Sequence, residues 1–234
     1  MGASPRTEIS KSLDPKSRAG ALPLIAGGLA LDFANTQSGR GGKRAIEHLG
    51  EDDDVVAWSL HAGLIDEGTA KRVRARLSRK DREFAGFLCD ALTLREAVHG
   101  VTVAIARGMP PAEKDLSHLA ACCASALAKA TLEMGEEGAR WRWPTQAPVP
   151  ETILGPIALS AIGILRESDP KRLKQCSGEH CGWVFFDMTK NRSRRWCEMS
   201  VCGNRAKASA HYRRSKIRAE AVAADEAPRA RHRA

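Results

Sequence analysis

Four cysteines near the C-terminal end of the chain constrain its fold more than any other feature. They form two pairs, with four residues inside each pair and fifteen between the pairs: Cys176, Cys181, Cys197 and Cys202. Two short loops that each present two thiolates can close a tetrahedron around one Zn²⁺, and zinc favours sulfur ligands. Four cysteine ligands leave no open position for water or substrate, so the pattern predicts one structural Zn²⁺.

The remaining composition favours a reducing environment for these thiols. The first twenty residues are polar and lack the apolar core of a secretory signal, and no apolar run approaches the roughly 20 residues of a membrane span. We therefore expect a cytoplasmic protein with no membrane attachment. In a reducing compartment, paired cysteines are more often metal ligands than disulfides.

The positive charge of the chain is concentrated in its cysteine-rich part. From Lys171 onward there are 16 Lys and Arg against 6 Asp and Glu, a net of +10, whereas the rest of the chain has a net of −1. Such asymmetry predicts a polyanionic partner, most simply nucleic acid. A solvated basic tail that only aids solubility is the alternative, but the basic residues alternate with aromatic residues and a predicted metal site.

Before Lys171, apolar residues recur mainly at helical spacing. The pattern predicts helices over 54–64, 81–107, 112–128 and 151–167, and a β-hairpin between Ala130 and Trp143. We therefore expect a mainly α protein with a helical N-terminal domain, a small β-hairpin and a C-terminal four-cysteine zinc module. The expected boundaries are a disordered tail at 1–20, the helical domain at 21–168, the zinc module at 169–220 and a disordered basic tail at 221–234.

The zinc module itself is predicted to contain a β-hairpin and a helix. Segments 172–175 and 183–187 suit two short strands, with the first cysteine pair at the turn that joins them. The second pair leads into a helix from about 204 to 220. Because so small a segment buries little apolar surface alone, metal binding would supply its folding energy.

Three segments resemble known families. The run RRWCEMSVCGNRAK at 194–207 resembles the CGNR zinc finger, named for Cys202 to Arg205, and CGWVFFD at 181–187 matches the same family. The segment GGLALDFANT at 27–36 resembles the start of the ABATE domain, which usually precedes this finger in bacterial proteins. The resemblance implies an α-helical N-terminal domain, a zinc-binding C-terminal module and a role as a bacterial transcription regulator linked to stress.

The basic residues around the second cysteine pair are the candidate nucleic-acid contacts. Arginine forks match phosphate oxygens and guanine edges, which favours double-stranded DNA as the partner. The predicted contacts are Arg194, Arg195, Arg205, Lys207, Arg213, Arg214, Lys216 and Arg218. Arg195 and Arg205 are equally suited to offset the negative charge of the zinc–thiolate centre.

Two questions about the partner stay open at this stage. An RNA-binding or ribosome-associated module would use the same charges, with aromatic side chains stacking on bases. A single finger reads few bases alone, and the logic of paired half-sites therefore favours a homodimer.

The helical domain offers no recognisable catalytic arrangement. It contains no paired catalytic carboxylates and no nucleophile–base pair, so we expect that the protein is not an enzyme. An alternative function is small-molecule binding, as an enzyme or as a sensor of an effector, around Asp32, Asn35, Thr36 and Trp58. Asp32 and Asn35 could also cap the adjacent helix or turn. The sequence favours this structural role over ligand binding.

Overall fold

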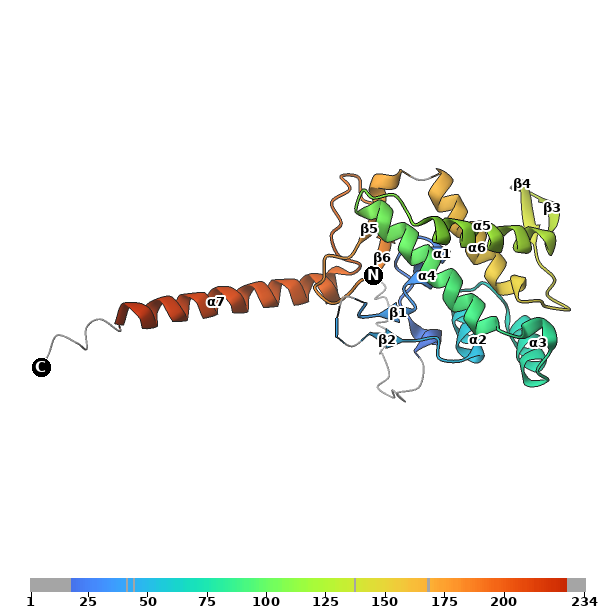
Figure 1. The fold of residues 1–234 in the computed structure, drawn as a ribbon, viewed down its shortest axis with the longest axis horizontal. Coiled ribbons are helices and arrows are strands. Elements are labelled where there is room, and N and C mark those ends of the chain that lie inside the picture. Colours follow the sequence, from blue (N-terminus) through green and yellow to red (C-terminus); the bar gives the residue numbers. More distant parts are fainter. Residues whose placement is uncertain (1–17, 41, 44, 137, 168, 227–234) are drawn as a thin grey trace, which may run out of the picture.

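The computed structural model describes residues 18–40, 42–43, 45–136, 138–167 and 169–226. Most of these residues form a rounded body, from which one long C-terminal helix extends as an arm (Figure 1). The tails predicted at 1–20 and 221–234 lie largely outside the described residues. None of the helices in the described ranges is long and apolar enough to cross a membrane.

The predicted fold class, mainly α with small β-hairpins, is confirmed. The helices are α1 (Leu29–Ala34), α2 (Asp52–His61), α3 (Glu67–Ser78), α4 (Phe87–Ala106), α5 (Glu113–Ala128), α6 (Glu151–Glu167) and α7 (Asn204–Glu226). The strands pair as three antiparallel hairpins: β1 (Gln37–Ser38) with β2 (Ile46–Glu47), β3 (Thr131–Gly135) with β4 (Gly138–Arg142), and β5 (Leu173–Gln175) with β6 (Val184–Phe186).

The core lies between α1, α2, α4, α5 and α6. Phe33 of α1 and Trp58 of α2 are both fully buried, with their ring centroids 5.0 Å apart. The apolar side of α4, predicted from its helical period, is buried along Ala91, Leu94, Val98 and Val101. The hairpin β5–β6 adds its own apolar side chains to the same core, so the cysteine-rich segment packs directly on the helical body.

The helices differ from the sequence prediction at one boundary and by one missed helix, both for local reasons. The helix expected to begin at residue 81 begins at Phe87, because Gly86 has φ +84°, a left-handed conformation that interrupts a helix. The sequence pattern also missed α3, since this helix is strongly polar and buries only Thr69, Ala70 and Val73.

Candidate metal centre and nucleic-acid interface

The first cysteine pair lies in the loop that joins β5 to β6, as the sequence predicts. The amide of Cys176 donates to the carbonyl of Trp183 at 2.8 Å and thereby extends the hairpin pairing to the first thiol. The amide of Cys181 donates to Gly178 O at 3.0 Å, which closes a tight turn. A Cβ atom on Gly178 would lie 3.2 Å from Cys181 Cβ and 3.4 Å from Cys202 Sγ, so the turn has little room for a side chain against the cysteines.

The second cysteine pair lies immediately before α7. The amide of Cys197 donates to Cys176 Sγ at 3.3 Å, which brings the two pairs together. The amide of Cys202 donates to Glu198 O at 3.0 Å within a wide helical turn over Met199–Gly203, and α7 follows directly. The position of α7 relative to the body is therefore set by the second cysteine pair.

The four thiols fit a single tetrahedral zinc ion. Their Sγ atoms all lie within 4.8 Å of one another, and Cys197 Sγ is 3.6 Å from the Sγ atoms of both Cys181 and Cys202. Zinc–sulfur bonds of about 2.3 Å in a tetrahedron place sulfurs about 3.8 Å apart. The structure thus contains a four-cysteine zinc site, and four sulfur donors leave no ligand position free for catalysis.

Electrostatics in this cluster favour a cation at its centre. Hydrogen bonds from the thiols of Cys181 and Cys197 lower the pKa of Cys176 to about 2. The hydrogen bond that each of Cys181 and Cys197 makes to Cys176 raises the pKa of its own thiol. One thiolate therefore opposes ionisation of its neighbours, and four thiolates coexist only when a dication compensates them.

The segment that connects the two cysteine pairs is held by a buried carboxylate. Asp187 is fully buried and its carboxylate accepts hydrogen bonds from Lys174 Nζ at 2.7 Å and from the amides of Thr189 and Arg194. Burial acts to raise the pKa of Asp187, but these hydrogen bonds outweigh it and hold the pKa below the usual range. The sequence analysis gave Asp187 no role of its own, although it ends the CGWVFFD segment.

The zinc module and α1 are joined through Asn35. Its Nδ2 donates to Val184 O at 2.9 Å, and its Oδ1 accepts from Val184 N at 2.9 Å. The side-chain amide thus pairs with β6 as a neighbouring strand would. A second contact follows at Phe186, whose amide donates to Ala26 O at 2.7 Å. These buried bonds fix the hairpin on the helical body.

The other predicted ligand-binding residues also make internal contacts. Asp32 accepts from Ala26 N at 2.8 Å, and burial raises the pKa of its carboxyl. Thr36 is buried and donates to Phe33 O at 2.8 Å, while Trp58 is packed on Phe33. The geometry favours the structural alternative: the backbone N–H of Asn35 closes α1 as its C-cap residue, while the Asn35 side chain pairs with a distant strand.

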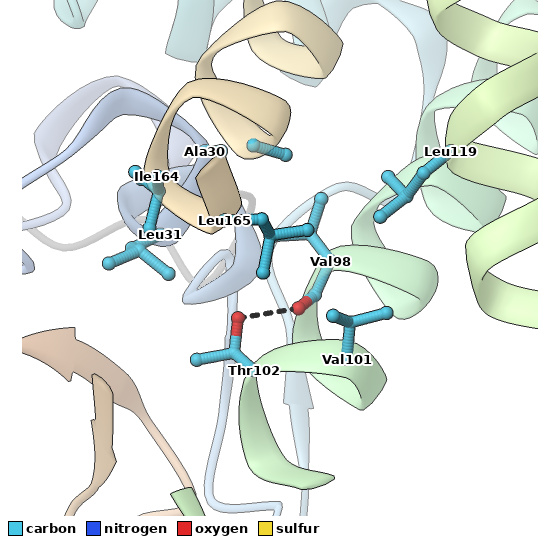
Figure 2. A pocket seen from close by; sticks show the side chains of 9 residues that line it. Ala30, Leu31, Val98, Val101, Thr102, Leu119, Ile164 and Leu165 are labelled. Atoms are coloured by element: carbon cyan, nitrogen blue, oxygen red, sulfur yellow. Dashed lines mark hydrogen bonds between the residues drawn. The ribbon is translucent and has the colours of Figure 1, made fainter. Parts of the chain in front are cut away.

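The small cavity beside α1 is unsuited to an effector. Its volume of about 10 Å³ has room for about one water molecule, and apolar side chains of α1, α4, α5 and α6 surround it (Figure 2). Its one labelled hydroxyl, Thr102 Oγ1, already donates to Val98 O at 2.7 Å. None of Asp32, Asn35, Thr36 and Trp58 lines this cavity.

The predicted nucleic-acid residues divide into two groups. Arg194 is half-buried: its guanidinium lies 4.4 Å from the Phe185 ring centroid and donates to the carbonyls of Ile25, Trp196 and Cys197. Its donors are therefore used inside the protein, and we assign Arg194 to the scaffold of the module. The remaining predicted residues are exposed: Arg195, Arg205, Lys207, Arg213, Arg214, Lys216 and Arg218.

The fold and the site together define a helical protein with a C-terminal four-cysteine zinc module. A family model for the ABATE domain, described as "putative stress-induced transcription regulator", matches residues 27–168, and a model for the CGNR zinc finger matches residues 172–215. The chain therefore belongs to the ABATE family and has a CGNR zinc finger, as its motifs predict. No curated protein matches the chain. Neither matched family is an enzyme family.

Proposed function

We propose that this chain is a zinc-dependent, DNA-binding transcription regulator whose helix α7 occupies the major groove of duplex DNA. The supporting observation is the distribution of charge on α7. At 100° per residue, Arg205, Arg213 and Lys216 lie on one side of the helix, and Lys207, Arg214 and Arg218 lie on the opposite side. The first side also carries Glu220, which lies 3.9 Å from Lys216 Nζ and leaves that row with a net charge of +2. A helix in the major groove has a phosphate backbone on each flank, so two opposed cationic rows suit that position.

The surroundings of α7 leave this helix accessible to a partner. Every side chain from 211 to 221 is exposed, including Tyr212 and Ile217. Figure 1 shows α7 extending away from the body. Isolated helices are marginal in water, and α7 has no acidic residue in its first turn and no basic residue in its last, so it gains nothing from its own dipole. Phosphate groups along its cationic rows would stabilise it.

The surfaces between the two rows carry mostly small residues, with Ile217 on one surface and Tyr212 at the edge of the other. Ala206, Ala210 and Ile217 lie on one such surface, and Ala208, Ser215 and Ala219 lie on the other. Small side chains let a helix approach base edges closely, and alanine can contact the thymine methyl group. We propose that one surface faces the bases while the other is free to contact a second copy of the chain in a homodimer.

Duplex DNA is favoured over single-stranded RNA by the aromatic residues of the module. Single-stranded RNA recognition requires exposed rings on which bases stack. Phe185 is fully buried, Trp183 is 9% exposed, and Trp196 is half-buried beside the Arg195 guanidinium. Tyr212 on α7 is the exception at 70% exposure, so the module offers many cations and one well-exposed ring. A role in a stress response agrees with the family description. We include in the proposal that this role is cytoplasmic, non-enzymatic and bacterial.

Two sets of charge variants test the position of α7. The first carries Arg205→Gln, Arg213→Gln and Lys216→Gln, and the second carries Lys207→Gln, Arg214→Gln and Arg218→Gln. Each should weaken binding of the zinc-loaded protein to a duplex in fluorescence anisotropy and should reduce the log–log salt slope by about 3. The control carries Lys71→Gln, Arg79→Gln and Lys114→Gln, which remove three exposed cations of the body.

The two sets also distinguish insertion in the groove from other modes. If only one row affects binding, α7 lies against one backbone and the groove position is wrong. If neither row affects binding while the zinc content is unchanged, α7 is not the DNA-binding element. Preference for single-stranded RNA over the duplex would contradict the choice of nucleic acid.

A further inference from the structure

A basic groove lies between the C-terminal end of α4 and the zinc module. It has a volume of about 520 Å³, within the range of small-molecule sites. Figure 1 shows the end of α4 beside β5, at the side of the body from which α7 departs. The groove is lined by residues 105–108 at the C-terminal end of α4, by residues of segment 170–177 around β5, and by Arg194 and Arg195.

Three cations of this groove have no carboxylate partner in the described part of the chain. They are Arg107, Lys171 and Arg195. By contrast, Lys174 forms an ion pair with Asp187 at 2.7 Å, and Arg194 donates to backbone carbonyls. No acidic residue is found among the described residues that line the groove. Its uncompensated charge therefore favours an anion.

The groove is preorganised by contacts that leave charged donors exposed. Arg107 Nη2 donates to Gln175 Oε1 at 2.9 Å, and this bond ties the end of α4 to β5. The Arg195 guanidinium lies 5.2 Å from the Trp196 ring centroid, while Arg195 O accepts from Ser177 N at 2.9 Å. The last turn of α4 is closed by Gly108 (φ +69°), whose amide donates to Ile105 O, so this helix-terminal carbonyl already has a donor.

Apolar residues form the other part of the lining. Ile105 and Ala106 are half-buried and offer side chains without polar groups, whereas Leu173 is 2% exposed and offers the groove almost no surface. A phosphodiester backbone would use the cations but not this apolar surface. We propose that the groove binds a small organic phosphate of about mononucleotide size, with its phosphate at Arg107 and Lys171 and its organic part on the apolar residues.

This site would connect the two matched segments of the chain. Arg107 belongs to the segment matched by the ABATE model, whereas Gln175 and Arg195 belong to the segment matched by the zinc-finger model. A ligand that contacts both would stabilise the packing of α4 against the zinc module by mass action. Binding of a small phosphate here would be independent of DNA binding, so it is measured first without DNA.

Isothermal titration of the full-length, zinc-loaded protein with AMP tests the site, with inorganic phosphate and adenosine as comparison probes. We expect saturable binding of one AMP per chain and weaker binding of both comparison probes. The variant Arg107→Gln/Lys171→Gln should lower the AMP affinity at least tenfold. The control Lys71→Gln/Arg79→Gln removes one lysine and one arginine that are exposed on and beside α3, and its affinity should stay within twofold of the parent protein.

Several results would overturn the proposal. They are the absence of saturable AMP binding, an unchanged affinity in the groove variant, or inorganic phosphate binding as tightly as AMP, which would exclude the apolar contact. The affinity of the groove variant for duplex DNA then shows whether the groove is a separate site or part of the DNA-binding surface. If it falls by the same factor as AMP affinity, the groove belongs to the DNA-binding surface, whereas an unchanged duplex affinity with lost AMP binding supports a distinct site.

Discussion

Replacing Asn35 tests how the zinc module is held on the helical body. Asn35 is 2% exposed, and its side-chain amide bonds to both the backbone N–H and the backbone C=O of Val184. Val184 is fully buried. Asn35→Ala leaves both backbone groups buried without a partner, at about 1–3 kcal/mol for each. We therefore expect a loss of about 2–6 kcal/mol, a large part of the roughly 5–15 kcal/mol by which domains are stable.

Equilibrium unfolding in urea, followed by far-UV circular dichroism at saturating zinc, measures this loss. Asn35→Asp should also destabilise the protein. The carboxylate still accepts from Val184 N, but its second oxygen cannot donate to Val184 O and repels that carbonyl oxygen. Asn191→Ala is the matched control, since Asn191 is exposed and no hydrogen bond of its side chain is seen in the described structure. A loss below about 1 kcal/mol for Asn35→Ala would refute the structural role and favour the small-molecule alternative.

Three further predictions concern the metal site and the arm. Gly178→Ala should lower zinc affinity about tenfold in competition with a chelating dye, because its Cβ would press on the cysteine cluster, while Gly163→Ala, which has open space, should not. Asp187→Asn should destabilise the protein. The wild-type pKa of Asp187 lies below its usual 3.8, so its contribution is complete above that pH and lost as pH falls through the folded-state pKa. The destabilisation in thermal unfolding should therefore be constant from about pH 5 to 8, and a change within that window would contradict the assignment. Duplex affinity should fall with salt at a log–log slope near −5 for about six phosphate contacts, and a slope near zero would exclude the α7 interface.

The zinc site was predictable because its information is local. Cysteine spacing and the need for closed tetrahedral coordination specify four ligands on two short loops without reference to the rest of the fold. The helices with a clear apolar period, α4, α5 and α6, were predictable for a similar reason. Helix α3 was missed, since only three of its side chains are buried and its sequence is dominated by charged residues.

The contacts that join the segments were not predictable from spacing. Asn35 and Val184 are 149 positions apart, and a lone asparagine after a short helix gives no sign that its amide pairs with a distant strand. Arg194 and Arg195 are adjacent and identical in type, yet one is enclosed by backbone carbonyls and the Phe185 ring while the other is exposed. That difference arises from tertiary packing around the second cysteine pair.

A zinc titration of duplex binding tests the central claim most directly. Metal-free, reduced protein is mixed with a labelled duplex, and fluorescence anisotropy is followed as Zn²⁺ is added. If the four cysteines hold one ion that sets the position of α7, binding should be weak without metal and should rise to a break at one zinc per chain. Full affinity of the metal-free protein, or a rise that continues beyond one equivalent, would contradict the account.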